Sequence, residues 1–263
     1  MRAMTLVLIA CAAFCTTYAG GLFAIALGDR LHLVLGFSAG AVVAVALVDL
    51  IPEAIEIGSA YHPPGTLLMW SMLSFLLYLV LDRIKLLHQP TVHGHGLHGK
   101  RPSSHHECTA AADAAAPRRR SISFGAGSFS AHSFLDGIAI GVAFQASAAV
   151  GAIVTLAVLA HDFSDGINTV SVVLKNGGTR AQAMRWLLAD ALAPAAGVCF
   201  MLLFTIPEDW LGAALAVFAG FFLYIGASDL VPESHHAHPK MLTTVMTLIG
   251  AGTICISVLL AGG

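Results

Sequence analysis

Two short stretches of the sequence combine histidine and aspartate at the same spacing. Residues 131–138 read AHSFLDGI and residues 160–167 read AHDFSDGI, so six of the eight positions agree. In each stretch the aspartate follows the histidine by four residues, which places both side chains on one face of a helix. Imidazole nitrogen and carboxylate oxygen together suit Zn²⁺, Fe²⁺ or Mn²⁺, and they suit Cu⁺ poorly. The repeat therefore predicts a divalent-metal site made of two pairs, His132 with Asp136 and His161 with Asp165.

The composition of the chain is that of a membrane protein. The chain is 57% hydrophobic and only 11% charged, whereas ordinary soluble domains are about 25% charged. The mean hydropathy is +0.81, so polar residues are too few to cover a soluble fold of this size. The net charge of −2 gives no indication of nucleic-acid binding. The five cysteines form no C-x-x-C pair, and they indicate no disulfide framework.

Eight apolar stretches are long enough to span a bilayer, which requires about 20 apolar residues per helix. The first stretch follows Arg2 as a signal peptide would, but it is longer than the roughly 7–15 apolar residues of a signal peptide. We expect a single all-α transmembrane domain over residues 1–263, embedded in the lipid of the cell membrane. The predicted spans are residues 4–27, 33–56, 65–87, 121–145, 149–174, 180–204, 209–234 and 240–262.

The basic residues predict the orientation of these spans. With both termini outside, the cytoplasmic loops and helix ends hold 12 of the 13 Lys and Arg residues, as the positive-inside rule requires. Residues 88–120 then form a cytoplasmic loop between the third and fourth spans. This segment has six histidines and no hydrophobic period, and we expect it to be disordered and to bind metal loosely. A solvated linker without a metal role is the alternative.

The predicted spans contain carboxylates but no deep basic residue. Their Lys and Arg residues lie near the cytoplasmic ends, where long side chains can extend to the interface. A charge at the bilayer centre costs at least about 2.5–3.5 kcal/mol, so the carboxylates need partners. A bound metal ion would balance them; protonated carboxyl groups hydrogen-bonded between helices are the alternative. Six of these carboxylates are Asp49, Asp136, Asp162, Asp165, Asp190 and Asp229.

The repeated motif also predicts a depth in the membrane. His132 and His161 fall midway along two consecutive spans, so both imidazoles should lie near the midplane. Consecutive spans run antiparallel, and a residue four positions further on is displaced by about 6 Å along the helix axis. Asp136 is then expected on the outer side of the histidines and Asp165 on the inner side. We predict a ladder of ligands along the membrane normal.

A second repeat occupies two more distant spans. The second span contains DLIPE at residues 49–53, and the seventh contains DLVPE at residues 229–233. The second span runs outward and the seventh inward, so the motif should lie at opposite mouths of the protein. Pro52 and Pro232 weaken the helices there. Matching interrupted helices in inverted orientation around a midplane site are typical of secondary transporters.

Four motifs together resemble a known family. They are HSFLDGIAIG and HDFSDG around the histidines, GFSAGAVVAVALVDLIPEA in the second span and YIGASDLVPESHH in the seventh. In this order they resemble a bacterial-type member of the ZIP family of divalent-metal (zinc/iron-regulated) transporters. The resemblance implies an inverted-repeat 3+2+3 bundle with both termini outside, often a homodimer. It also implies uptake of Zn²⁺, or of Fe²⁺, Mn²⁺ or Cd²⁺, into the cytoplasm.

The resemblance also implies roles for individual residues. The central site falls on the two His–Asp pairs, and an adjoining second site falls on Ser133 and Asp162, with Asp136 and Asp165 bridging. Many bacterial members have Asn in place of Ser133 and Glu in place of the two bridging aspartates. Many also have Glu directly before the sixth-span proline, where this chain has Ala193.

Two further sets of ligands are open at this stage. Asp190, one turn before Ala193, is a candidate substitute at the second metal position. Glu233, His235 and His236, at the inner end of the seventh span, are candidate ligands for release of the ion. A hydrated helix end with no metal role is the alternative for these three.

Two other functions use similar residues. Cation-diffusion efflux transporters bind metal with His and Asp on two helices, but those helices are not adjacent. An intramembrane zinc hydrolase would need a catalytic zinc, which is commonly bound by histidine-rich sets with one position open for water. Here only two histidines lie deep in the spans and carboxylates dominate. We therefore interpret the chain as a transporter rather than an enzyme.

Overall fold

The computed structural model describes residues 2–23, 31–88, 107–236 and 241–261, and all regular elements in these ranges are helices. The predicted all-α fold is therefore confirmed. The elements are α1 (Arg2–Phe23), α2 (Leu31–Ala44), the π-helix η2 (Val45–Leu50), α3 (Ile51–Gly58), α4 (Pro64–His88), α5 (Glu107–Ala146), α6 (Ala148–Lys175), α7 (Arg180–Leu202), α8 (Glu208–Tyr224), the π-helix η3 (Ile225–Leu230), α9 (Val231–His236) and α10 (Met241–Ala261).

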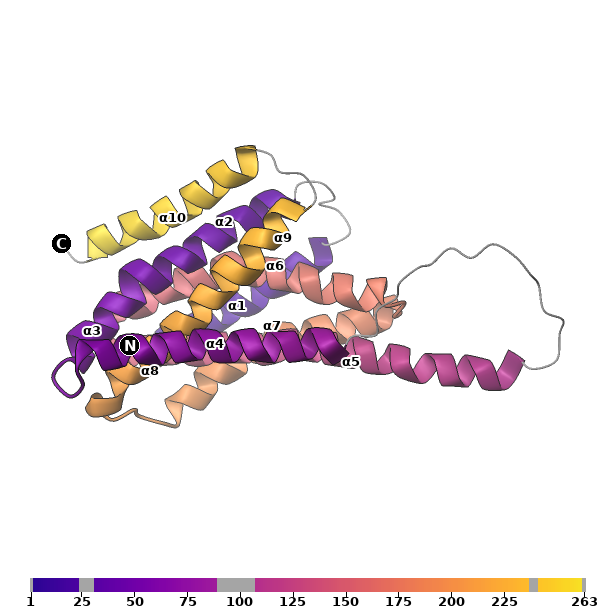
Figure 1. Ribbon diagram of the computed structural model, residues 1–263, viewed down its shortest axis with the longest axis horizontal. Coiled ribbons are helices and arrows are strands. Elements are labelled where there is room, and N and C mark those ends of the chain that lie inside the picture. The colour runs from indigo at the N-terminus through magenta and orange to yellow at the C-terminus, as the bar shows by residue number, and fades with distance from the viewer. Residues whose placement is uncertain (1, 24–30, 89–106, 237–240, 262–263) are drawn as a thin grey trace.

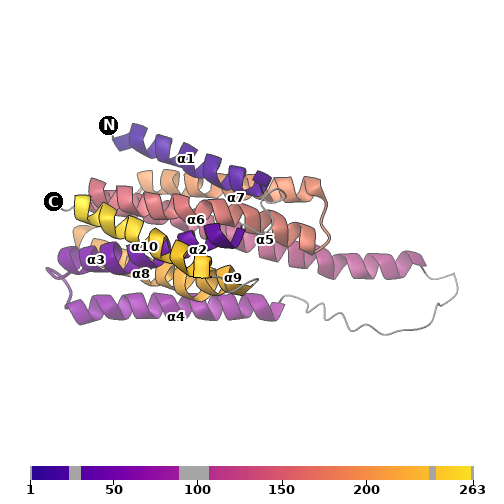
Figure 2. The ribbon, with the colours of Figure 1, turned by 90° about the horizontal axis from the view of Figure 1, so that it is seen from above.

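Two of the long helices are composite, because α2, η2 and α3 follow one another directly, as do α8, η3 and α9. Counting each composite as one, the described residues form eight helices along one bundle axis (Figures 1 and 2). The start of α1 and the end of α10 lie at the same end of the bundle, as eight crossings require. In the described ranges, seven of these helices are long and apolar enough to cross a membrane. The eighth, α5, carries the polar pair His132 and Asp136.

The boundary between the predicted histidine-rich loop and α5 differs from the sequence-based expectation. We expected residues 88–120 to be loop, but residues 107–120 are helical and belong to α5. This first part of α5 extends beyond the end of the bundle (Figures 1 and 2). The segment is rich in alanine, the residue with the highest helix propensity, which favours helix even where no hydrophobic period predicts a span. Residues 89–106, with most of the histidines, lie outside the described residues.

The helices divide into two groups by their packing. Helices α1, α5, α6 and α7 pack mainly on one another, and we call them the site group because it includes α5 and α6. The composite helices, α4 and α10 form the second, flanking group. The two groups meet mainly where α2 crosses α6. There Ser38 of α2 donates a hydrogen bond to the carbonyl oxygen of Ala160, the residue before His161.

Close helix contacts in the site group follow the repeat of the His–Asp motif. Gly137, directly after Asp136, faces the backbone of Pro194 in α7 so closely that a methyl group would overlap its carbonyl oxygen. Gly166, directly after Asp165, faces the carbonyl oxygen of Thr17 in α1 in the same way. Small residues permit such close approach between membrane helices. The reciprocal contacts match as well: Gly197 against Phe134, and Gly20 against Phe163. Helix α7 therefore packs on α5 as α1 packs on α6, which supports the predicted inverted repeat.

The DLIPE and DLVPE motifs share an unusual local structure. In each copy a six-residue π-helix ends at the leucine of the motif, two residues before the proline. Proline has no backbone N–H and cannot complete the regular α-helical pattern. The wider π-helical turn accommodates this interruption, and such turns occur often at functional sites. The second repeat therefore has the same backbone geometry in both halves of the molecule.

Candidate metal site

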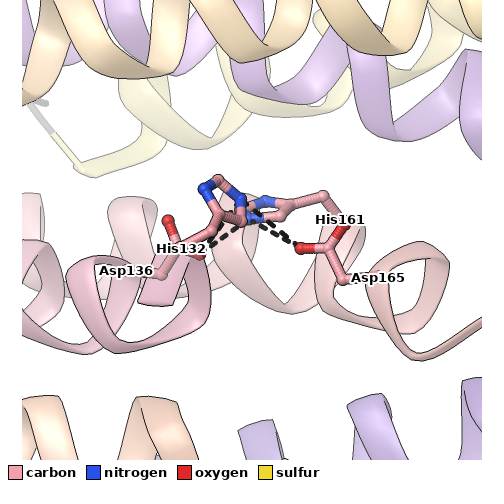
Figure 3. A group of neighbouring side chains, drawn as sticks. All are labelled: His132, Asp136, His161 and Asp165. Atoms are coloured by element: carbon pink, nitrogen blue, oxygen red, sulfur yellow. Dashed lines mark ion pairs between the residues drawn. The ribbon is translucent and has the colours of Figure 1, made fainter. Parts of the chain in front are cut away.

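Four polar side chains converge between α5 and α6 (Figure 3). The Nε2 atom of His132 lies 3.3 Å from Oδ2 of Asp136 and 3.5 Å from Oδ2 of Asp165. The Nε2 atom of His161 lies 3.4 Å from Oδ2 of Asp136 and 3.9 Å from Oδ2 of Asp165. All four residues are buried. Two side chains from each helix thus form one compact group of potential ligands.

This arrangement is a cluster and not the ladder that the helical rise predicts. One ligand atom from each of the four residues lies within 4.8 Å of the other three. The axial step between residues four apart is about 6 Å for the backbone. Helical side chains lean toward the N-terminus and bring such pairs together. The separation of the ligands along the membrane normal is therefore lost at the level of the side-chain tips.

The orientation of His161 is fixed by its own helix. Its Nδ1 atom donates a hydrogen bond of 3.0 Å to the carbonyl oxygen of Ala157, one turn earlier. With the proton on Nδ1, the lone pair of Nε2 points toward the carboxylates of Asp136 and Asp165, as a metal-binding imidazole requires. The flanking group encloses the histidine rings: Phe221 and Tyr78 lie beside His132, and Phe222 lies beside His161.

Several buried polar atoms at this site have no hydrogen-bond partner among the described residues. They include both carboxylate oxygens of Asp136 and of Asp162, Oδ2 of Asp165 and Nε2 of His161. Leaving such groups unsatisfied is expensive, at about 1–3 kcal/mol each and more for charged ones. Tetrahedral ligands about 2.0–2.1 Å from Zn²⁺ lie about 3.3 Å from one another, close to three of the four distances at the site, which are 3.3, 3.4 and 3.5 Å. The donor set therefore fits a divalent cation.

Hydrogen bonding differs among the residues expected at a second metal position, which are Ser133, Asp162 and Asp190. Ser133 donates a hydrogen bond of 2.9 Å to Oδ1 of Asp190. Thr169 of α6, which the sequence did not single out, donates one of 2.7 Å to Oδ2 of the same aspartate. Asp162 is fully buried, and both of its oxygens lack a hydrogen-bond partner in the described part of the chain.

A cavity of about 140 Å³ extends from the cluster toward one end of the bundle. His132 and Asp165 line its deep side, with Asn168 next to them. Asp82 of α4 and Asp229 of η3 line it further toward the C-terminal end of α4. The remaining lining residues are Tyr78, Gly125, Ser128, Phe129, Val172, Ile225 and Leu230.

Asp82 is a residue that sequence reasoning missed. It precedes Arg83 and Lys85, and these two suggested an ordinary cytoplasmic helix end. In the structure, Asp82 accepts a hydrogen bond of 3.1 Å from the hydroxyl of Tyr224, and its position in the cavity depends on the packing of α4 against α8.

The structure describes the three expected release ligands only in part. Glu233 is exposed on α9, and the side chains of His235 and His236 lie outside the described residues.

Comparison with known proteins identifies the family. The family model described as ZIP zinc transporter matches residues 88–257. The chain belongs to the ZIP zinc transporter family. It is 30% identical to Zinc transporter zipt-7.1 of Caenorhabditis briggsae, over 48% of this chain and 35% of that protein. It is 31% identical to Zinc transporter SLC39A7 of Mus musculus, over 50% of this chain and 29% of that protein. It is 35% identical to Zinc transporter ZIP4 of Homo sapiens, over 38% of this chain and 16% of that protein.

The alignments thus cover about a third or less of each relative's own length. The family match includes the whole of α5, α6 and α7 and both His–Asp pairs. Membership in this ZIP family confirms the resemblance read from the four motifs. It also agrees with the interpretation of the chain as a multi-pass membrane transporter rather than an enzyme.

Proposed function

We propose that this ZIP-family chain imports divalent metal cations, with Zn²⁺ as the main substrate, into the cytoplasm across the cell membrane. The observation that carries the proposal is the buried cluster of two histidines and two aspartates between α5 and α6. In the described part of the chain, the contacts within this cluster join histidine nitrogen to aspartate oxygen, and no Lys or Arg takes part. A transported cation supplies the missing positive charge.

Each ligand has a defined role in this proposal. His132 and His161 bind the ion through Nε2, and Asp136 and Asp165 bind it through carboxylate oxygen. Asp162 adds a carboxylate when the ion occupies the side of the cluster nearer to it, because its oxygens are buried and unpartnered. Fe²⁺, Mn²⁺ and Cd²⁺ are secondary substrates, since they accept the same mixture of imidazole and carboxylate.

The cavity supports a direction for release. It extends from His132 and Asp165 toward the end of the bundle where α4 stops, and the distribution of basic residues predicts that this end faces the cytoplasm. Asp229 and Asp82 provide oxygen ligands along the way. On the opposite side Asp49, the counterpart of Asp229, is buried with Oδ2 unpartnered. The structure thus supports a state open to the cytoplasm and closed to the outside.

The test is metal transport in membrane vesicles of known sidedness. Right-side-out vesicles should accumulate radioactive Zn²⁺ in a saturable manner, and unlabelled Cd²⁺, Fe²⁺ and Mn²⁺ should compete. The matched control is His161→Ala at equal protein abundance. Accumulation in inverted vesicles alone would identify an efflux transporter, and equal transport by the variant would exclude the cluster from the pathway. The homodimer and the metal-binding role of the histidine-rich loop remain predictions from the sequence.

A further inference from the structure

Asp190 connects the two helices that carry the metal ligands. It lies on α7, and its side chain is fully buried. One carboxylate oxygen accepts a hydrogen bond from Ser133 of α5 at 2.9 Å, and the other accepts one from Thr169 of α6 at 2.7 Å. A single carboxylate on a third helix therefore joins α5 to α6, and both of its oxygens are engaged.

The two donors differ from other buried hydroxyl groups in the site group. A helical Ser or Thr usually bonds the carbonyl oxygen four residues earlier in its own helix. Thr17 and Thr155 do so, donating to Ala13 and Gly151. Ser133 and Thr169 donate across helices to Asp190 instead. Each of these bonds satisfies one oxygen of a fully buried carboxyl group, and leaving a buried polar group without a partner is costly, which favours the interhelical arrangement.

The two residues that Asp190 joins lie next to the metal ligands on their helices. Ser133 follows His132 in sequence, and Thr169 lies four residues after Asp165, on the same face of α6. Helix α7 is itself held against α5 by the close contact of Gly137 with the Pro194 backbone. Asp190 therefore ties α6 to a rigid α5–α7 pair. A change at Asp190 should alter the separation of the two His–Asp pairs.

The two halves of the inverted repeat differ at the depth of Asp190. Pro194 and Thr17 make equivalent contacts in the two halves of the repeat. Asp190 lies four residues before Pro194, and Ala13 lies four residues before Thr17. Ala13 is therefore the counterpart of Asp190. Ala13 is buried and cannot accept a side-chain hydrogen bond. Asp162, the counterpart of Ser133, has no hydrogen-bond partner for either oxygen among the described residues. One half of the repeat thus has an anchored carboxylate on α7, and the other half has a free carboxylate on α6.

We propose that Asp190 is a positioning residue that fixes the spacing of α5 and α6 and does not bind the transported ion. Ser133 and Thr169 are its two attachment points, and Ser133 is thereby withdrawn from the ligand set. Asp162 is the carboxylate that extends the cluster. This inference rests on the proposed function of the cluster, and it assigns Asp190 and Ser133 differently from the second metal position that the family resemblance implies.

The first experiment measures the connection without metal. Thermal unfolding of the purified full chain is followed for Asp190→Ala, for Ser133→Ala/Thr169→Val and for the three changes combined. The control is Thr155→Val, a buried threonine that bonds only within its own helix. If Asp190 acts through the two hydroxyls, the combined variant unfolds at the same temperature as Asp190→Ala, because the same interaction is already lost. Additive losses would overturn the proposal.

The second experiment uses Co²⁺ as a spectroscopic probe of ligand geometry. Asp190→Ala and Ser133→Ala/Thr169→Val should show the same shift of the Co²⁺ visible absorption bands. Both should lower Co²⁺ affinity by about tenfold, a typical coupling between neighbouring groups, without changing the number of ions bound per chain. Asp190→Asn should restore the wild-type bands, since an amide can still pair with both hydroxyls. A residue that only stabilised the fold would leave the bands unchanged.

Two results would overturn this assignment. A lower number of bound ions, or a larger loss of affinity in Asp190→Asn than in the double hydroxyl variant, would make Asp190 a ligand. Unchanged bands in Asp190→Ala would remove its positioning role. The proposed function is tested separately by His161→Ala. Retained Co²⁺ binding in that variant contradicts the cluster as the ion site, whereas the metal-free unfolding result for Asp190 stands or falls independently.

Discussion

The two π-helical segments both end in Asp-Leu and have the same type of backbone, but they differ in their surroundings. In η2, Asp49 is 6% exposed, and Oδ2 has no hydrogen-bond partner within the described residues. In η3, Asp229 is exposed and lines the cavity that reaches His132 and Asp165. Both segments end at the leucine of a DL[IV]PE motif. Exposure of the aspartate is therefore decided by the neighbouring helices and not by the local structure of the segment.

The centre of the molecule behaves differently from its two mouths. There both copies of the motif contribute the same two ligand types, all four ligands are buried, and each adjacent glycine touches a neighbouring backbone, although their hydrogen-bond partners differ. A central site with ligands from both halves, between unlike mouths, is compatible with alternating access by an inverted repeat. The ion site can remain intact while one mouth opens and the other closes.

Because each half supplies one histidine and one aspartate to the central site, loss of a ligand from either half should have a large effect. His132→Ala and His161→Ala should each abolish saturable uptake, and Asp165→Ala should do the same, because each removes one of four ligands. Loss of residues that merely support metal ligands weakens affinity by about 10–100-fold, so loss of a ligand should exceed this range. Radioactive Zn²⁺ uptake is measured against protein abundance. His62→Ala, at a partly exposed histidine in the turn before α4, remote from the cluster, is the control and should transport normally. A large difference between the two histidine variants would show that the halves are not equivalent.

The glycine contacts predict matched losses of stability. Gly137→Ala and Gly166→Ala each place a methyl group against a backbone carbonyl oxygen in a neighbouring helix. The helices must separate, and overpacking of this kind costs about 1–3 kcal/mol. Thermal unfolding in detergent measures the loss. Gly252→Ala, on α10, is the control because its added methyl group would meet no atom within 4 Å. Wild-type stability in either test variant would contradict the close packing of α5 on α7 or of α6 on α1.

The unlike mouths predict unequal access for thiol reagents. In the absence of metal, Asp229→Cys should react from the cytoplasmic side about tenfold faster than Asp49→Cys reacts from the outside. This ratio corresponds to an outward-open state that makes up roughly a tenth of the molecules. Metal and pH should shift the two rates in opposite directions. The background has every native cysteine replaced: Cys11, Cys15, Cys108, Cys199 and Cys255. Simultaneous labelling of both mouths under all conditions would indicate a channel.

A graded effect is expected for the dependence of metal affinity on pH, since a change of pH modulates the central site without removing a ligand. The ion binds neutral imidazole and ionised carboxylate, so protons compete with it. An ordinary histidine titrates near pH 6.5, and lowering the pH from 7 to 5.5 should weaken binding by up to about tenfold for each histidine that must lose a proton. The transport constant for Zn²⁺ is measured across this range on the open side. An affinity that stays constant from pH 7 to 5.5 would mean that histidine protonation is not coupled to binding.

Local signals in the sequence determined much of this protein. The apolar runs, the basic residues and the two repeats are readable from short stretches, and they predicted an all-helical membrane bundle and the four residues of the cluster. Periodicity could do this because His and Asp four residues apart share a helix face whatever surrounds the helix. It did not predict that an alanine-rich stretch extends α5 back to Glu107, since that stretch has no apolar face to reveal a helix.

Contacts between helices that are distant in sequence determined the features that local patterns did not predict. The expected ladder became a cluster because side-chain direction, and not backbone rise alone, places the ligand atoms. Asp190, a candidate ligand from the sequence, accepts hydrogen bonds from Ser133 and Thr169 of two other helices, which the sequence did not predict. Asp82 gained a role only because α4 packs beside α8 and places it in the cavity. These outcomes depend on which helices are neighbours, and the pattern within one helix carries no information about the helix packed against it.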